Sequence, residues 1–184
     1  MEEQNTAKKS LGREILEWIA CILAAFVITL ILRNFVFSLV RVQGASMDPT
    51  LASGDRLVMI RLGYEPKKGD VVVVDPDNGS DAPYIKRIIG MPGDEIKFVI
   101  GVTGEVMMTI NGELQRESYI SSVFYPGNVG EGEYVVPEGH VFVMGDNRPN
   151  SRDSRDASVG FIPFDHVMGE TVFRLWPLSK IGAM

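Results

Sequence analysis

The sequence is poor in the residues that build disulfides and zinc sites. Its 184 residues include one cysteine and two histidines. Cys21 has no partner with which to form a disulfide inside the chain, so a folded domain must be held together by its core alone. His140 and His166 are too few and too isolated for a zinc motif. We therefore expect no internal disulfide and no metal.

An excess of positive charge is also missing. The formal net charge is −6 at pH 7, and the four basic and four acidic groups of the first 36 residues cancel each other. The whole negative excess therefore belongs to the remainder of the chain. Because an acidic surface repels a phosphate backbone, this distribution argues against nucleic acid as a partner.

One long apolar run stands out near the N-terminus. It extends from Ile15 to Leu32, and its only polar residues are Glu17 and Thr29. Eighteen helical residues with a rise of about 1.5 Å each cover roughly 27 Å, which is close to the hydrocarbon thickness of a bilayer. The run therefore predicts a transmembrane helix.

Basic residues flank this run on both sides. Three precede it and two follow it, namely Lys8, Lys9 and Arg13, then Arg33 and Arg41. The small excess before the run favours an N-terminus in the cytoplasm. A cleavable signal peptide is the alternative, but the run is long for one and no small-x-small cleavage pattern follows it before Gly44. We predict a cytoplasmic tail over residues 1–14, a transmembrane anchor helix over 15–36 and an extracytoplasmic domain over 37–184.

The remainder of the chain shows short apolar or alternating segments between Gly/Pro turns. Residues 70–75 form a β-branched block that is typical of a strand buried on both faces. Asn111-Gly112 is the strongest hairpin signal, and Pro76–Gly79 has turn chemistry. Residues 113–133 lack periodicity and predict a surface excursion. Further strands are expected at 39–42, 55–60, 84–90, 96–102, 106–110, 134–136, 140–144 and 171–176.

No amphipathic helix pattern follows the apolar run. Many short strands with Gly/Pro turns predict an all-β domain, built as a curved or barrel-like sheet assembly. The fold class expected for the whole chain is therefore mainly β, with one N-terminal transmembrane helix.

A serine lies in a turn of small residues shortly after the apolar run. Gly44 and Ala45 allow another backbone to approach Ser46 closely, and Pro49 fixes the turn that follows. A nucleophile needs such a corner, because the exposed N–H groups of the turn can stabilise an oxyanion. Taken alone, a serine in a Gly/Pro turn is more often only a turn residue.

A serine nucleophile also needs a base, and neither histidine has a suitable context. A lysine can serve if burial lowers its pKa. Lys86 lies among apolar residues in Tyr84–Gly90, and in a strand Lys86 and Arg87 point to opposite faces, so one of the two should face inward. The alternative is an edge-strand lysine that deters aggregation.

A third segment, Gly145–Arg155, is dense in Asn, Asp and Arg and follows a predicted strand. Such density favours an ordered loop that is hydrogen-bonded to itself around a site. A solvated loop is the simpler alternative.

Four segments together resemble the conserved boxes of type I (leader) signal peptidases. They are Gly44–Leu51, Gly54–Arg56, Tyr84–Asp94 and Gly145–Arg155, and their order, their spacing and the preceding apolar run all agree with the family. The short length and single predicted membrane segment resemble the compact enzymes of Gram-positive bacteria. The resemblance implies a LexA-like catalytic β fold and a membrane-anchored serine endopeptidase without cofactor. Its partners would be secretory preproteins, cleaved after Ala-x-Ala sites on the outer membrane face, and membrane lipid.

The resemblance also implies a role for each matching residue. Ser46 matches the nucleophile, and its backbone N–H matches the oxyanion donor. Lys86 matches the general base, which takes the serine proton, passes it to the leaving amine and later activates the deacylating water. Ser151 matches the serine that orients the lysine amine. Asp153 matches an aspartate that supports the loop through Arg155 or neighbouring backbone.

Gly44 stands where some family members carry a hydroxyl residue that adds a second oxyanion donor. That side-chain donor is absent here, although the compact Gram-positive enzymes also have glycine.

The resemblance also extends to substrate binding. Val40, Val42 and Ile85 match the walls of the family's shallow substrate pockets, with core packing as the alternative for each.

Three apolar residues near the serine, Met47, Leu51 and Met59, match a region that rests on lipid in the family, and plain core packing is the alternative.

Two rival functions remain open at this point. One is LexA-like self-cleavage, and the other is a catalytically inactive membrane-tethered module that binds exported chains.

Overall fold

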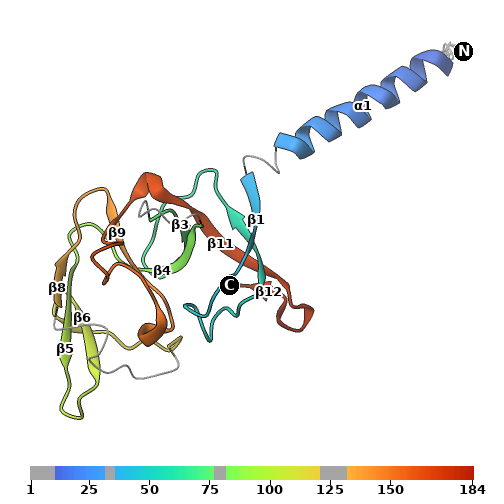
Figure 1. Ribbon diagram of the computed structural model, residues 1–184. Coiled ribbons are helices and arrows are strands. Elements are labelled where there is room, and N and C mark those ends of the chain that lie inside the picture. The colour runs from blue at the N-terminus through green and yellow to red at the C-terminus, as the bar shows by residue number, and fades with distance from the viewer. Residues whose placement is uncertain (1–10, 32–35, 77–81, 121–131) are drawn as a thin grey trace, which may run out of the picture.

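The computed structural model describes residues 11–31, 36–76, 82–120 and 132–184 (Figure 1). One helix, α1 (Leu11–Ile31), precedes a domain made of strands and short 3-10 helices. The strands are β1 (Phe37–Arg41), β2 (Arg56–Ile60), β3 (Val71–Val74), β4 (Tyr84–Gly90), β5 (Glu95–Ile100), β6 (Val106–Ile110), β7 (Glu113–Leu114), β8 (Gly132–Val135), β9 (His140–Met144), β10 (Ile162–Pro163), β11 (Val167–Trp176) and β12 (Gly182–Ala183). The 3-10 helices are η2 (Arg148–Asn150), η3 (Phe164–His166) and η4 (Leu178–Lys180). The mainly β fold class is thus confirmed.

Helix α1 begins at Leu11, within the segment predicted as a tail, so its first turn carries charged residues. Residues 11–30 are all exposed, and Figure 1 shows the helix projecting away from the β domain. Within residues 11–31, 36–76, 82–120 and 132–184, no helix is both long enough and apolar enough to cross a membrane. The predicted helix segment 32–35 lies outside the described residues.

The larger sheet has the order β1-β2-β11-β3-β4-β9-β10, and β12 adds to β11. All of its pairings are antiparallel. Strand β3 is buried at all four positions, as its β-branched composition predicts. Strand β11 is the longest and pairs with β2, β3 and β12, with register shifts that let it curve between them. The ribbon β1–β2 is therefore joined to the ribbon β3–β4 through β11.

The smaller sheet has the order β7-β6-β5-β8 and lies on the side of the domain away from β1 (Figure 1). Asn111 and Gly112 have φ values of 53° and 81° and connect β6 to β7, so the predicted hairpin is confirmed. Pro137–Gly139 connects β8 to β9, which belong to different sheets. The predicted turn at Pro76–Gly79 lies outside the described residues from 77 onward.

Three clusters of buried side chains form the core. One joins the two sheets through Ile89, Phe142 and Met144 on the larger and Ile96, Phe98 and Met108 on the smaller. The curved or barrel-like sheet assembly expected from the sequence consists of two sheets that share a core. A second cluster contains Met47, Leu51 and Met59, which are at most 2% exposed. These three residues pack inside the protein, and their interpretation as a lipid-facing surface is wrong.

Candidate active site

Ser46 and Lys86 meet although 40 residues separate them in the sequence. The Lys86 Nζ lies 2.7 Å from the Ser46 Oγ, within hydrogen-bonding distance. Ser46 follows β1 in the turn that leads to β2, and Lys86 is the third residue of β4. Lys86 is only 4% exposed, so it is the inward-facing member of the pair that the strand pattern identified. The alternative of a solvent-exposed edge-strand lysine that deters aggregation is wrong, because the Lys86 side chain is buried and its amine contacts Ser46.

Burial lowers the pKa of Lys86 from the usual 10.5 to about 8. The nearby Arg155 guanidinium lowers it further, while the carboxylates of Asp153 and Asp146 oppose the shift. Because the unprotonated amine alone can accept a proton, this shift raises the fraction competent as a base at pH 7 to roughly one in ten.

The polar loop that follows β9 holds the serine turn in place. The Asn147 backbone N–H donates to the Ser46 carbonyl at 3.0 Å, and its side-chain amide donates to the Ala45 carbonyl at 2.9 Å. Gly145 packs directly against this turn, because a Cβ there would overlap the Ser46 carbonyl oxygen and the Ser151 hydroxyl. Gly145 and Asn147 belong to the box recognised in the sequence, yet neither was assigned a role there. The position of Gly145 directly before Asp146-Asn147 was the sequence signal that the loop could approach the serine turn closely.

Ser151 packs against the same side of Gly145 as the Ser46 carbonyl, since a Cβ on Gly145 would meet both. Its hydroxyl is buried and has no hydrogen-bond partner in the part of the chain that the structure describes. The hydrogen bond to the Lys86 amine that the family resemblance implies is therefore not made in this structure.

Asp153 is fully buried and is held by Arg155. The Arg155 Nε and Nη2 atoms donate to its two carboxylate oxygens at 2.7 and 2.8 Å. The second oxygen also accepts from the Gly145 backbone N–H at 3.0 Å, and Arg155 Nη2 donates to the Arg148 carbonyl at 2.8 Å. The ion pair thus fixes the loop from inside, because both Asp153 carboxylate oxygens accept hydrogen bonds from Arg155 and one also accepts from Gly145.

A second buried carboxylate, Asp146, was not singled out from the sequence. It is 1% exposed and accepts from the Arg87 Nε and Nη2 at 2.9 and 2.7 Å. The Thr50 hydroxyl donates to the same carboxylate at 2.5 Å. Because side chains alternate along a strand, Arg87 lies on the face opposite Lys86. Its bidentate ion pair with Asp146, called the fork below, connects β4 to the loop after β9, and the Thr50 hydrogen bond connects that loop to the serine turn.

Gly44 has a φ of +83°, in the left-handed region that favours glycine. The space around it is open, since a Cβ would meet no atom within 4 Å. The backbone conformation, rather than a close neighbour, therefore accounts for the glycine in this turn.

A groove of about 560 Å³ runs past the two reactive side chains. Val40 and Ile85 line it, together with Ser46 and Lys86. Val42 is 3% exposed and packs in the core beside Leu57, so it does not reach the groove.

The strands that border the groove have edges without a strand partner. Among the described strands, β1 is hydrogen-bonded only to β2. The ladder between β4 and β9 begins at Arg87, so Ile85 and Lys86 are paired with a strand on the β3 side alone. An extended chain between β1 and the beginning of β4 would find two open edges.

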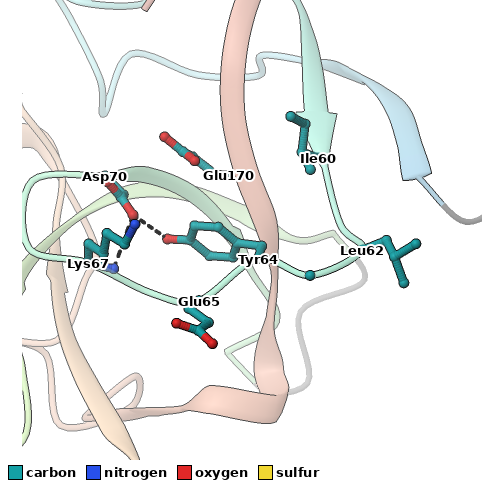
Figure 2. A pocket seen from close by; sticks show the side chains of 8 residues that line it. Ile60, Leu62, Tyr64, Glu65, Lys67, Asp70 and Glu170 are labelled. Atoms are coloured by element: carbon teal, nitrogen blue, oxygen red, sulfur yellow. Dashed lines mark hydrogen bonds between the residues drawn. The ribbon is translucent and has the colours of Figure 1, made fainter.

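A separate pocket of about 320 Å³ lies beside the end of β2 (Figure 2). Asp70 accepts from the Tyr64 hydroxyl at 2.7 Å and from the Lys67 backbone N–H at 3.0 Å, which fixes the turn between β2 and β3. Burial raises the pKa of Glu170, and the Asp70 carboxylate raises it further. The pocket contains neither Ser46 nor Lys86, and its hydrogen bonds serve the local fold.

Glu170→Gln is expected to raise the melting temperature slightly at neutral pH. The folded protein binds a proton on Glu170 more tightly than the unfolded chain, so ionisation of Glu170 costs stability as pH rises above its ordinary pKa. The gain should stay below about 1 kcal/mol because the site is partly open to solvent. Thermal unfolding of both proteins from pH 4 to pH 8 measures it. A gain that is equal at all these pH values would contradict this explanation.

The site places a serine hydroxyl against a buried lysine amine within a domain of antiparallel sheets. The family model described as "Signal peptidase, peptidase S26" matches residues 15–176. This chain therefore belongs to the signal peptidase family S26 and is a serine endopeptidase of the signal peptidase I type.

Named relatives cover nearly the whole chain. Signal peptidase IB of Staphylococcus aureus strain COL is 37% identical over 181 residues, which cover 91% of this chain and 93% of the relative. Signal peptidase I of Bacillus licheniformis is 38% identical over 192 residues and covers 98% of this chain and 97% of its own. A crystal structure of a signal peptidase I from Enterococcus faecalis V583 is similar with 28% identity and a TM-score of 0.47, over 58% of this chain and 97% of that one.

Proposed function

We propose that this chain removes N-terminal signal peptides from exported preproteins, with Ser46 as nucleophile and Lys86 as general base. The observation that carries the proposal is the 2.7 Å contact between the Ser46 Oγ and the amine of Lys86, a residue that is only 4% exposed and whose pKa is lowered to about 8. Family membership supports the substrate class. No metal or organic cofactor is required for this chemistry.

The reaction would proceed in two steps. The neutral Lys86 amine takes the Ser46 proton as the Oγ attacks the scissile carbonyl, and the resulting ammonium gives this proton to the departing amine. An acyl-enzyme on Ser46 remains. Lys86, neutral again, then activates a water that hydrolyses the ester and releases the signal peptide.

The developing oxyanion would be stabilised by the backbone N–H of Ser46. Gly44 offers no side-chain donor, so its left-handed backbone contributes through the shape of the turn. The loop after β9 supports this assignment, because its contacts with the Ala45 and Ser46 carbonyls hold the turn rigid.

The substrate would bind as an added strand between β1 and the start of β4. Val40 and Ile85 line the groove at this point. We propose that they restrict it to small side chains, as cleavage after small-x-small (Ala-x-Ala) sites would require. Because Val42 is buried, we assign the pocket wall to the other two residues and not to Val42.

The experiment that tests this function is cleavage in trans. The full chain in detergent is mixed with a purified preprotein, and the new N-terminus is sequenced. We expect it to follow an Ala-x-Ala site. Cleavage of the enzyme itself with no cleavage of the preprotein would favour LexA-like self-processing, and labelling of Ser46 by a serine-reactive probe separates both from an inactive binding module.

We further propose that the apolar run Ile15–Leu32 anchors the chain in the cytoplasmic membrane as a single pass, with residues 1–14 inside and the domain from residue 37 outside. The exposed apolar side chains of α1, such as Ile22 and Phe26, support contact with lipid.

The double variant Ile22→Asp, Phe26→Asp is expected to release the protein from membranes, since each charge at the centre of an anchor helix costs about 3 kcal/mol. Alkaline carbonate extraction of cell membranes measures the release. External protease should degrade the β domain of the unaltered chain in intact spheroplasts. Retention of the double variant in the carbonate pellet would count against the anchor, and full protection of the domain would reverse the orientation.

A further inference from the structure

The segment directly after β7, residues 115–120, leaves the smaller sheet and crosses to the loop that holds the serine turn. We call it the strap. The sequence predicted a surface excursion here, but Glu117 and Tyr119 are partly buried and contact two arginines that adjoin the active site. Neither residue belongs to the boxes that resemble the family.

Glu117 is the partner of a buried arginine. The Arg148 guanidinium is 1% exposed, and its Nη1 and Nη2 atoms donate to the Glu117 carboxylate at 2.5 and 2.6 Å. The Nε of the same arginine donates to the Gly145 carbonyl at 3.1 Å. Since Gly145 packs against the Ser46 carbonyl, a single guanidinium connects the strap to the nucleophile turn.

Tyr119 contacts β4, the strand that carries Lys86. Its ring lies 4.0 Å from the Arg87 Cζ, which is stacking distance, and its hydroxyl donates to the Glu117 carboxylate. Arg87 follows Lys86 in β4 and forms the fork with Asp146. The ring thus covers the outer face of the ion pair that fixes both Lys86 and the loop.

We propose that Glu117 and Tyr119 are positioning residues for the Ser46–Lys86 pair. The carboxylate neutralises a buried guanidinium that holds Gly145, and the ring restrains the Arg87–Asp146 fork behind Lys86. Without the strap, Arg148 becomes a buried cation without a counter-charge and must move toward solvent, taking the Gly145 carbonyl with it. This inference rests on the proposed roles of Ser46 and Lys86.

The strap does not line the substrate groove, so its loss should affect the catalytic step and not substrate binding. Loss of positioning should lower kcat and leave KM nearly unchanged, because a misplacement of about 1 Å between reacting groups can cost roughly 100-fold in rate. A residue that only stabilised the fold would instead lower the melting temperature and the active fraction, with normal kcat for the molecules that remain folded.

The experiment compares four variants of the full chain in detergent on one preprotein. Tyr119→Leu keeps apolar bulk without the π face, Tyr119→Phe keeps the ring without the hydroxyl, and Glu117→Ala removes the carboxylate. Lys97→Ala is the matched control, because it breaks two exposed ion pairs in the smaller sheet, with Glu95 and with Glu133, away from the strap. Each protein is first shown to be folded at the assay temperature by its thermal unfolding curve.

We expect kcat to fall at least tenfold in Glu117→Ala and in Tyr119→Leu, with KM within about twofold. Tyr119→Phe should restore kcat to within about threefold of the original, and Lys97→Ala should match it. If Glu117→Ala is unfolded, Tyr119→Leu decides the question, because it leaves the Glu117–Arg148 pair in place.

A folded Tyr119→Leu with unchanged kcat, or a loss confined to KM, overturns the positioning role. Equal losses in Tyr119→Leu and Tyr119→Phe overturn the role of the ring. Failure of the underlying function is recognised separately, because the unaltered chain would then not cleave the preprotein or Ser46→Ala would remain active.

Discussion

Ser46→Ala and Lys86→Ala are each expected to abolish cleavage of a preprotein, with a fall in kcat/KM of at least about 1,000-fold. The first would remove the proposed attacking oxygen, and the second would remove the proposed base, whose Nζ lies 2.7 Å from that oxygen. Lys86→His should fail as well, because the shorter imidazole does not reach the same point. Single-turnover cleavage assays with excess enzyme measure these losses.

Intact folding of these variants is the necessary control. Lys86→Ala removes a buried amine whose charge burial disfavours, so its thermal unfolding should not occur at a much lower temperature. Lys97→Ala, an exposed lysine on β5, should cleave normally. Normal cleavage by a folded Ser46→Ala or Lys86→Ala would refute the dyad.

The pH dependence of the unaltered enzyme follows from the same pair. Only the neutral amine is competent, and the pKa of Lys86 is about 8, so kcat/KM should rise about tenfold per pH unit below pH 8 and level off above it. A profile that continued to rise toward pH 10 would mean that Lys86 has its ordinary pKa and that burial does not activate it.

Gly145→Ala is expected to lower kcat/KM by about 100-fold or more. The added methyl group would overlap the Ser46 carbonyl oxygen and the Ser151 hydroxyl, so the serine turn or the loop must shift. Gly182→Ala is the matched control, because a Cβ at that glycine meets no atom within 4 Å and its φ is not in the left-handed region. The kinetic constants of both variants on one preprotein measure the difference.

If Gly145→Ala is folded and as active as Gly182→Ala, the close approach of the loop to the serine turn does not constrain catalysis. The melting temperatures of the two variants separate a local shift from general destabilisation. A loss of activity with a normal melting temperature supports a local shift of the turn.

The sequence was most informative where residue type alone determines structure. The β-branched block at 71–74 became a fully buried strand, and Asn111-Gly112 became a hairpin turn, because both depend on neighbours in the chain. Strand alternation also predicted that only one of Lys86 and Arg87 faces inward.

The missing parts of the site depend on pairings between distant residues. Asp146 and Arg87 are 59 positions apart, and Glu117 and Arg148 are 31 apart. No local sequence pattern can therefore predict either ion pair. Val42 was misplaced for a related reason, since alternation along β1 does not say where that strand ends and the core begins. The missing Ser151 hydrogen bond likewise depends on loop geometry beyond local sequence.

The central place of β11 has a consequence for the order in which the enzyme is made. The ribbon that delivers Ser46 and the ribbon that carries Lys86 are joined in the sheet through β11, residues 167–176. A ribosome synthesises the nucleophile and the base long before it reaches that strand. Until β11 is added, the two ribbons lack their shared neighbour in the sheet, and the loop that carries Asp146 bridges them through Thr50 and Arg87. A growing chain would therefore contain Ser46 and Lys86 before the strand that joins their ribbons, and we expect full activity only after β11 has been synthesised.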